Sequence, residues 1–228
     1  RHIVAILDEA FEGLETAEAN AEANLASAEE LFRSHLKVTF PNALGANENA
    51  VKAGWEIRKL KDCILPFAIG TKVPKKAYNA SGEFPIISQE EEFISGYWSK
   101  AEDLTKVDTC VVIYGDHTQV VKLVDFDFVA GADGIKVLSP KPEISPGFLF
   151  YFIIGNKVPS LGYARHFRHL KEIMVPIPPL EEQCRSVAIL DNFRFQTDCL
   201  KKDMNHKLSQ IRELKQSLLQ KAFAGELT

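Results

Sequence analysis

Two short stretches of the chain combine basic, aromatic and polar side chains of the kinds that contact duplex DNA. Such contacts need Lys or Arg at phosphates, and Arg, Lys, Asn, Gln or aromatic groups at base edges. The stretch TKVPKKAYN at 71–79 and the stretch GYARHFRHLK at 162–171 each supply both kinds. The residues in them that we predict to contact DNA are Lys72, Lys75, Lys76, Tyr78, Tyr163, Arg165, His166, Arg168, His169 and Lys171.

Arg165 and Arg168 are three positions apart, so on a helix they would share one face. One of them could then pair bidentately with guanine while its neighbour holds a phosphate. Ser88 and Gln89, at the end of a strand-like run, could add uncharged contacts to base edges. For each of these residues the alternative is a solvated polar surface, which is where such side chains usually lie.

Other chemistry is less well supported by the sequence. The stretch GDHT at 115–118 looks like part of a catalytic loop, but it has no nucleophile elbow and no triad partners, which favours a plain turn. His166 and His169 are spaced to bind a metal, yet no further ligand stands at a recognisable distance, so we predict no metal site. We also find no glycine-rich phosphate loop and no methyltransferase motif, and therefore expect a non-catalytic chain that binds no cofactor itself.

Composition and charge are those of an ordinary globular protein. The 228 residues are 46% hydrophobic and 25% charged, with a net charge of −4. Residues 1–40 hold three basic and eight acidic side chains, residues 41–180 hold sixteen of each, and residues 181–228 hold eight basic and seven acidic ones. Any nucleic-acid surface must therefore arise from local clustering. No apolar run approaches the roughly 20 residues that cross a bilayer, so we expect a cytoplasmic location.

The elements that must position these side chains include two long helices. Residues 3–40 contain no proline, and their apolar residues recur at helical 3-4 spacing until Pro41. A second helix is predicted after Pro178-Pro179, with Glu181-Glu182 in its first turn. The residues that we predict to pair the two helices are Leu7, Phe11, Leu14, Leu25, Leu200, Met204, Leu208, Ile211 and Leu218.

The two helices are copies of one element. Sliding one along the other by 183 positions aligns VAILD at 4–8 with VAILD at 187–191, and 11 of 37 positions from Val4 to Phe40 are identical. Average composition would give roughly two or three identities by chance. The alternative, that any two amphipathic helices look alike, does not explain an unbroken identical pentapeptide at the same phase.

Between the copies the sequence predicts a compact α+β domain. Strand-like runs at 84–88, 110–114 and 119–124 are separated by turns at 115–116 and 131–134. The predicted organisation is a first long helix at 1–44, a globular domain at 45–178 and a second long helix at 179–228. The fold class is thus α+β, with a globular domain flanked by two repeated helices that pair as an antiparallel coiled coil.

Three features together resemble the specificity subunit of type I restriction-modification systems. They are the repeated VAILD helix, the lead-in VPIPPLEEQ at 175–183, and the domain opening GWEIRKLKD at 54–62 followed by GEFPIISQ at 82–89. The combination covers essentially the whole chain. It looks like the C-terminal half of such a subunit: the end of a central helix, the second target-recognition domain and the C-terminal helix.

The resemblance implies a function made with partners. The recognition domain would read one half of a bipartite double-stranded DNA target, and the paired helices would set the distance between half-sites. The same helices would dock methyltransferase subunits, which carry S-adenosylmethionine, and a restriction subunit would join through the complex. Half-length chains could also form a homodimer that imitates a full subunit. The alternative is a coiled-coil scaffold for proteins with no DNA role, which the zero net charge of residues 41–180 favours.

Overall fold

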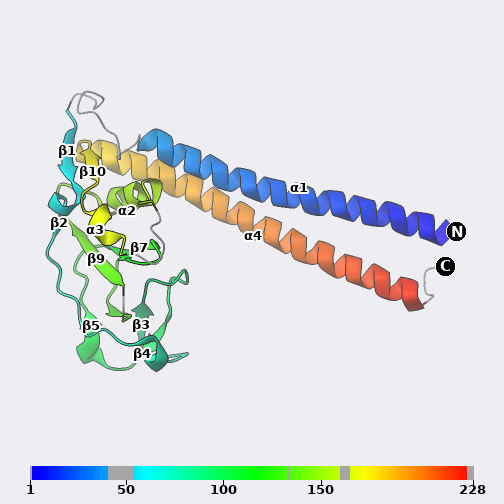
Figure 1. Cartoon of the computed structure of the whole chain (residues 1–228), viewed down its shortest axis with the longest axis horizontal. Helices are drawn as coiled ribbons and strands as arrows, with labels where there is room; N and C mark the ends of the chain where they lie inside the picture. Colours follow the sequence, from blue (N-terminus) through cyan, green and yellow to red (C-terminus); the bar gives the residue numbers. More distant parts are fainter. Residues whose placement is uncertain (1, 41–53, 133, 160–164, 225–228) are drawn as a thin grey trace. The chain divides into compact units, whose positions relative to one another are not determined.

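The computed structural model describes residues 2–40, 54–132, 134–159 and 165–224. It forms two compact units, one made of residues 1–35 and 190–228 and the other of residues 36–189. Figure 1 shows the elements along the chain. Their order is α1 (His2–Thr39), β1 (Glu56–Lys59), η2 (Leu60–Asp62), β2 (Ile64–Leu65), η3 (Lys75–Ala77), β3 (Phe84–Ile87), β4 (Gly96–Trp98), η4 (Ala101–Asp103), β5 (Leu104–Thr105), β6 (Val111–Gly115), β7 (Val121–Val124), β8 (Phe128–Ala130), β9 (Ile135–Pro140), α2 (Pro146–Gly155), α3 (Phe167–Leu170), β10 (Met174–Ile177) and α4 (Leu180–Ala224).

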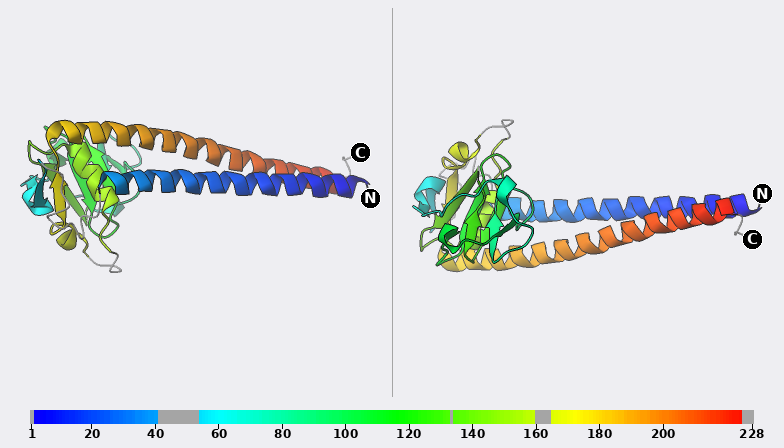
Figure 2. Two further views of the ribbon diagram at one scale, coloured as in Figure 1. Left: turned by 90° about the horizontal axis from the view of Figure 1, so that it is seen from above. Right: turned by 90° about the horizontal axis from the view of Figure 1, so that it is seen from below.

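The helical unit confirms the predicted antiparallel pair. Helices α1 and α4 have 38 and 45 residues, and they run side by side in opposite directions in all three views (Figures 1 and 2). Side chains that are buried or half-buried follow the 3-4 spacing of a coiled-coil seam. On α1 these are Phe11, Leu14, Glu18, Ala21, Leu25, Ala28, Phe32 and His35, and on α4 they are Leu190, Phe193, Thr197, Lys201, Met204, Leu208, Ile211, Lys215 and Leu218.

Most of the residues predicted to pair the helices lie on this seam, but Leu200 does not. Its side chain is 37% exposed, and the neighbouring Lys201 takes the seam position instead. A lysine can do this because its aliphatic stem packs while its ammonium reaches outward. The Lys201 ammonium lies 2.9 Å from the Glu29 carboxylate. The side chain of Leu7 is outside the described residues.

The repeat gives the pair an internal two-fold relation. Ala21 and Met204 occupy equivalent positions in the two copies (204 − 21 = 183), and they lie together with Leu208 in one buried cluster. The ion pair Glu29–Lys201 corresponds, under the same exchange of copies, to Glu18–Arg212 at 3.4 Å. Glu18 also pairs with Lys215 at 2.8 Å. Because the acids are on α1 and the bases on α4, pairing of two α1 helices or of two α4 helices would oppose like charges.

Reversing these charges tests the pairing. We expect E18K/E29K to lower the melting temperature of the chain, and E18K/E29K/K201E/K215E to recover most of the loss because opposite charges face each other again at the two shortest of these ion pairs. Hydrogen bonds from Lys215 and Lys201 lower the pKa of Glu18 and Glu29 below the ordinary value of 4.5. Their stabilisation is therefore present above about pH 4.5 and is lost as the pH falls through the lowered pKa values. Equal melting temperatures for the double and quadruple variants would contradict the pairing.

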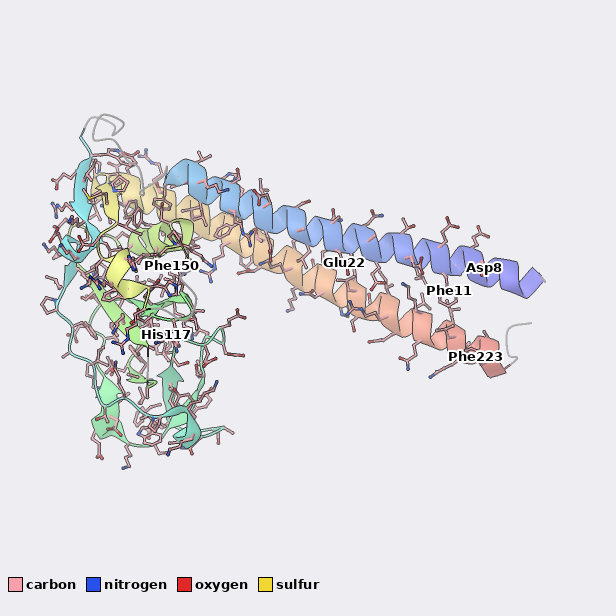
Figure 3. The ribbon with its side chains drawn as sticks, in the orientation of Figure 1. Asp8, Phe11, Glu22, His117, Phe150 and Phe223 are labelled. Atoms are coloured by element: carbon pink, nitrogen blue, oxygen red, sulfur yellow. The ribbon has the colours of Figure 1, made fainter. Side chains whose placement is uncertain are left out.

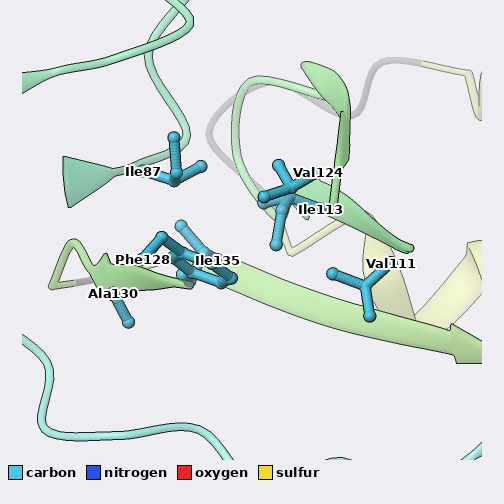
Figure 4. Close-up of a cluster of buried hydrophobic side chains, with 7 residues drawn as sticks. All are labelled: Ile87, Val111, Ile113, Val124, Phe128, Ala130 and Ile135. Carbon is cyan, nitrogen blue, oxygen red and sulfur yellow. The ribbon is translucent and has the colours of Figure 1, made fainter. Parts of the chain in front are cut away.

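The domain of residues 36–189 is built on short strands. Among the described residues, the sheets have the orders β2-β9-β6-β7, β4-β3-β8-β5 and β1-β10. Strands β3 and β8 are parallel and the other paired strands are antiparallel. Figure 4 shows the core cluster that joins side chains of the two larger sheets: Ile87, Val111, Ile113, Val124, Phe128, Ala130 and Ile135.

Helix α2 is buried on nearly all sides within this domain. Its N-terminus is capped by the Ser145 hydroxyl, and its side chains from Phe148 to Ile153 are all buried. Phe40, just after α1, packs edge-to-face on Phe148 and Phe152 with ring centroids 5.2 and 5.8 Å apart. No helix in the described part of the chain is long and apolar enough to cross a membrane.

Candidate nucleic-acid interface

The turn that follows β6 fastens the second basic stretch to the sheet. Asp116 is only 3% exposed, and its carboxylate Oδ1 accepts the Phe167 N–H at 2.8 Å. Its backbone carbonyl accepts the His166 N–H at 2.9 Å and lies 3.0 Å from His166 Nδ1. That nitrogen must be the protonated one, because a carbonyl oxygen only accepts. Asp116 therefore fixes where the side chains after residue 164 emerge.

Around this anchor the structure places a basic surface hollow of about 480 Å³. Four cations and one buried carboxylate line it, so its charge is positive although the domain as a whole is neutral. Its lining residues are Asp116, Lys136, Arg165, Phe167, Arg168, His169 and Lys171. We call this surface the basic hollow.

Two of the four cations of the basic hollow lie over the aromatic ring of Phe167. The ammonium groups of Lys171 and Lys136 lie 5.6 and 5.8 Å from the centre of its ring, within range of a cation–π interaction. Lys136 is also 3.7 Å from the Asp116 carboxylate. Arg165 and Arg168 are exposed, and among the described residues neither forms an ion pair. Their guanidinium groups are free to take a phosphate or a base edge.

The end of β3 reaches the same turn through Gln89. The carboxamide Oε1 of Gln89 accepts the His117 N–H at 3.3 Å, and its backbone carbonyl accepts the Thr118 hydroxyl at 2.7 Å. Figure 3 labels His117 on this turn. Two of the predicted contact regions, Ser88-Gln89 and 165–171, are thus brought together by the GDHT turn, which the sequence identified only as a connection.

A buried lysine shapes the loop on the other side of Gln89. Lys122 is 4% exposed, and its ammonium donates to the carbonyls of Ser88 at 3.0 Å and of Phe93 at 3.4 Å, and also to that of Glu92. Burial lowers its pKa from 10.5 to about 8. The ammonium holds both ends of residues 89–91, so the loop is a fixed part of the surface.

The first basic stretch divides into exposed and packed parts. Lys72 and Lys76 are exposed, and Lys75 pairs with Glu90 at 3.0 Å. Val73 forms a bridge to Gly131, which brings this stretch beside the loop after β8. None of these lysines lines the basic hollow.

Several predicted contact residues lie inside the protein. His166 is 1% exposed and Ser88 is 4% exposed, with the Ser88 hydroxyl 2.6 Å from that of Ser95. Tyr78 is half-buried against the cluster around Val73. The predictions for His166 and Ser88 are therefore wrong, because both side chains are closed off from the surface, whereas part of Tyr78 remains exposed and its contact stays a prediction. Arg165 precedes α3 instead of sharing a helical face with Arg168, and Tyr163 lies outside the described residues.

Two contributors to the site were missed by sequence reasoning, Lys136 and Phe167. Lys136 stands alone among apolar residues on β9, and no cluster of charge marks it in the sequence. The one sequence feature that could have indicated Lys136 is its position just after the predicted 131–134 turn. In the structure Lys136 pairs with Tyr114, close to the end of the neighbouring strand β6.

The first strand of the domain, β1, pairs with β10, the strand that precedes α4. The pairing runs from Glu56 opposite Ile177 to Lys59 opposite Met174. The Trp55 indole donates to the Glu182 carboxylate at 3.1 Å. Lys59 and Lys61 both contact Glu172 and lower its pKa to about 2. The chain thus returns to its starting point before α4 begins.

The last residue of the PPLEEQ motif, Gln183, has a structural role. It is fully buried, and its carboxamide accepts the Ser145 N–H at 2.8 Å and donates to the carbonyls of Glu143 and Pro178 at 3.0 and 2.8 Å. Only an amide of this length supplies one acceptor and two donors to three backbone groups here. It therefore ties the first turn of α4 to the loop before α2.

The chain thus combines an α+β domain that carries a basic hollow with two long helices that are copies of one element. The model of the type I restriction modification DNA specificity domain matches residues 52–210, and the chain belongs to this family. It is 32% identical over 117 residues to the type I restriction enzyme EcoDI specificity subunit of Escherichia coli, covering 47% of this chain and 26% of that protein. It is 25% identical over 188 residues to the type I restriction enzyme MjaX specificity subunit assigned in Methanocaldococcus jannaschii, covering 76% and 43%.

Solved structures share the fold. A chain from a study of complex assembly and conformational transition of the type I R-M system superposes with a TM-score of 0.78 at 22% identity, covering 98% of this chain and 58% of that one. The HsdS subunit of Thermoanaerobacter tengcongensis superposes with a TM-score of 0.60 at 22% identity, covering 100% and 58%. The chain therefore spans less than two thirds of the length of the relatives that it matches, and it has the same fold as these solved chains.

Proposed function

We propose that the domain between the helices reads one half of a bipartite double-stranded DNA target in a type I restriction-modification complex. The observation that carries this is the basic hollow, which four cations line: Arg165, Arg168 and Lys171 from the segment fixed by buried Asp116, and Lys136 from β9. The guanidinium groups of Arg165 and Arg168, which form no ion pair with any described residue, lie together at this hollow, and such groups bind phosphates and guanine edges. Lys72 and Lys76 are further exposed cations of the domain that could contact phosphates.

The test is duplex binding by the chain together with its methyltransferase subunits. We expect affinity to fall steeply as salt rises, because each phosphate contact releases counterions. One half-site should accept only a narrow set of sequences, whereas the rival scaffold function predicts no preference among duplexes. Equal binding to all duplexes would overturn the proposal.

We infer that the paired helices dock the methyltransferase subunits through their outer faces. Leu31 and Leu214 are equivalent in the repeat, and both are exposed, by 54% and 49%. Two related apolar positions on a two-fold helix pair suit two copies of one partner. In this account S-adenosylmethionine is bound by the partner, the restriction subunit joins through the complex, and the chain itself catalyses nothing.

Charge substitution on the outer faces tests this docking. We expect L31K/L214K to reduce co-purification of the methyltransferase subunit at least tenfold, because a charge replaces a desolvated apolar contact. The matched control is F195K, an exposed aromatic on α4 whose equivalent in α1 is Glu12. Full recovery of the partner with L31K/L214K, or with a chain lacking residues 181–228, would contradict the assignment.

The ion pairs between α1 and α4 restrict how two copies of this chain could form a homodimer. Two chains can exchange helices only by pairing α1 of one with α4 of the other, since like helices would oppose like charges. Sedimentation of the purified chain, alone and with the methyltransferase subunit, measures which assembly forms.

A further inference from the structure

Gln89 occupies a slot that two glycines leave open. A side-chain carbon at Gly134 would lie 2.3 Å from Gln89 Oε1, and one at Gly115 would lie 2.9 Å from Gln89 Cβ. Gly134 also has a φ of +91°, a conformation that other residues rarely adopt. The turn and the loop before β9 are therefore shaped around this one glutamine.

The contacts of Gln89 fix which way its amide points. The backbone N–H of His117 can only donate, so the group that faces it must be the carbonyl oxygen of the carboxamide. The amide nitrogen Nε2 then points away from the turn. It bonds to no described residue and is not fully buried, so this donor remains partly exposed on a half-buried side chain.

The loop around Gln89 is fixed on both sides. Lys122 holds the carbonyls of residues 88, 92 and 93, and the Thr118 hydroxyl holds the carbonyl of Gln89 itself. The turn that binds Gln89 is the same turn whose Asp116 lines the basic hollow. A duplex held by the cations of the hollow is therefore brought beside a glutamine whose orientation is already set.

We propose that Gln89 is a specificity-determining residue that presents an N–H donor to a guanine edge. A free glutamine reads adenine with both amide groups, its oxygen accepting from N6 and its nitrogen donating to N7. Here the carboxamide oxygen of Gln89 accepts the His117 N–H, so only the amide N–H donors remain for DNA. These donors suit a base edge that presents acceptors. Guanine, with O6 and N7 adjacent in the major groove, is the base that offers this. The inference rests on the proposed function, since it needs the domain to bind duplex DNA.

The experiment compares the base preference of the complete methyltransferase complex, position by position, on duplexes with a randomised half-site. We expect the wild type to select guanine at one position, and Q89A to lose that preference by roughly 10-fold to 100-fold there and at no other position. Q89E keeps the shape of the side chain but presents an acceptor, so it should reject guanine at the same position. Q220E, on an exposed part of α4, is the matched control and should behave as wild type.

G134A provides a second variant that leaves Gln89 in the sequence but displaces its amide. It should weaken the same single preference as Q89A. Unchanged base preference in folded Q89A and Q89E complexes would overturn the assignment, as would a uniform loss of affinity for all sequences. If those complexes still bind DNA with strong salt dependence, the inference on Gln89 fails alone and the proposed DNA function stands.

Discussion

Replacing both Arg165 and Arg168 with Ala is expected to weaken specific DNA binding by about 2 to 4 kcal/mol, roughly 30-fold to 1,000-fold. Both side chains are exposed, and in the described part of the chain neither has a carboxylate partner, so little is lost from the fold. Binding measured at several salt concentrations should also show a shallower dependence, by roughly 0.9 in slope for each phosphate contact removed.

The control is a variant that loses two positive charges at another place in the chain. R185A/R194A removes two exposed arginines from α4, where they pair with Glu181 and Asp198. Its DNA affinity should stay within about twofold of wild type. Equal losses in the two double variants would show that bulk charge, and not the basic hollow, binds the duplex.

Replacing Phe40 with Ala is expected to destabilise the chain by about 3 to 5 kcal/mol. Phe40 is 3% exposed and packs on Phe148 and Phe152, so its removal leaves a cavity against α2. Its equivalent in the second copy, Phe223, is 88% exposed on the last turn of α4 (Figure 3).

The pair of equivalent phenylalanines makes an internal control. F223A should change the free energy of unfolding by less than about 0.5 kcal/mol, because nothing in the described chain covers that ring. Urea unfolding of the purified chain measures both variants. Similar losses for F40A and F223A would mean that the packing of Phe40 against α2 does not hold in solution.

The long helices could be predicted almost to the residue because their signal is local. The helix predicted over 3–40 is α1, and the start predicted near 181 is α4. The exceptions on the seam are Leu200, Lys201 and Lys215. A search for apolar residues at 3-4 spacing passes over lysines whose charge is satisfied by the facing helix.

The domain was predicted less completely because its elements depend on distant partners. The strand-like runs correspond to β3, β6 and β7, but the apolar run that forms α2 has no amphipathic period, since it is buried on nearly all sides. Short strands such as β2 and β5 exist only through pairing with β9 and β8. No local pattern of two residues can indicate that.

The candidate site shows the same limit at the level of side chains. Residue types located the basic stretch after 162 but could not separate exposed Arg168 from buried His166, because a turn 50 residues earlier decides which of them faces inward. The GDHT turn carried no signal of its own. Its role depends on two distant contacts: Asp116 of the turn binds the Phe167 N–H, and Thr118 of the turn binds the carbonyl of Gln89.

Methylome sequencing is the most direct test that this chain reads half of a bipartite target. The comparison is between cells with the intact gene, cells without it, and cells in which residues 54–178 are exchanged for the corresponding domain of a relative. We predict methylation at a two-part motif that needs the gene, and a change in one half of the motif alone, with the spacing kept, after the exchange. Methylation that persists without the gene, or a motif untouched by the exchange, would contradict the account.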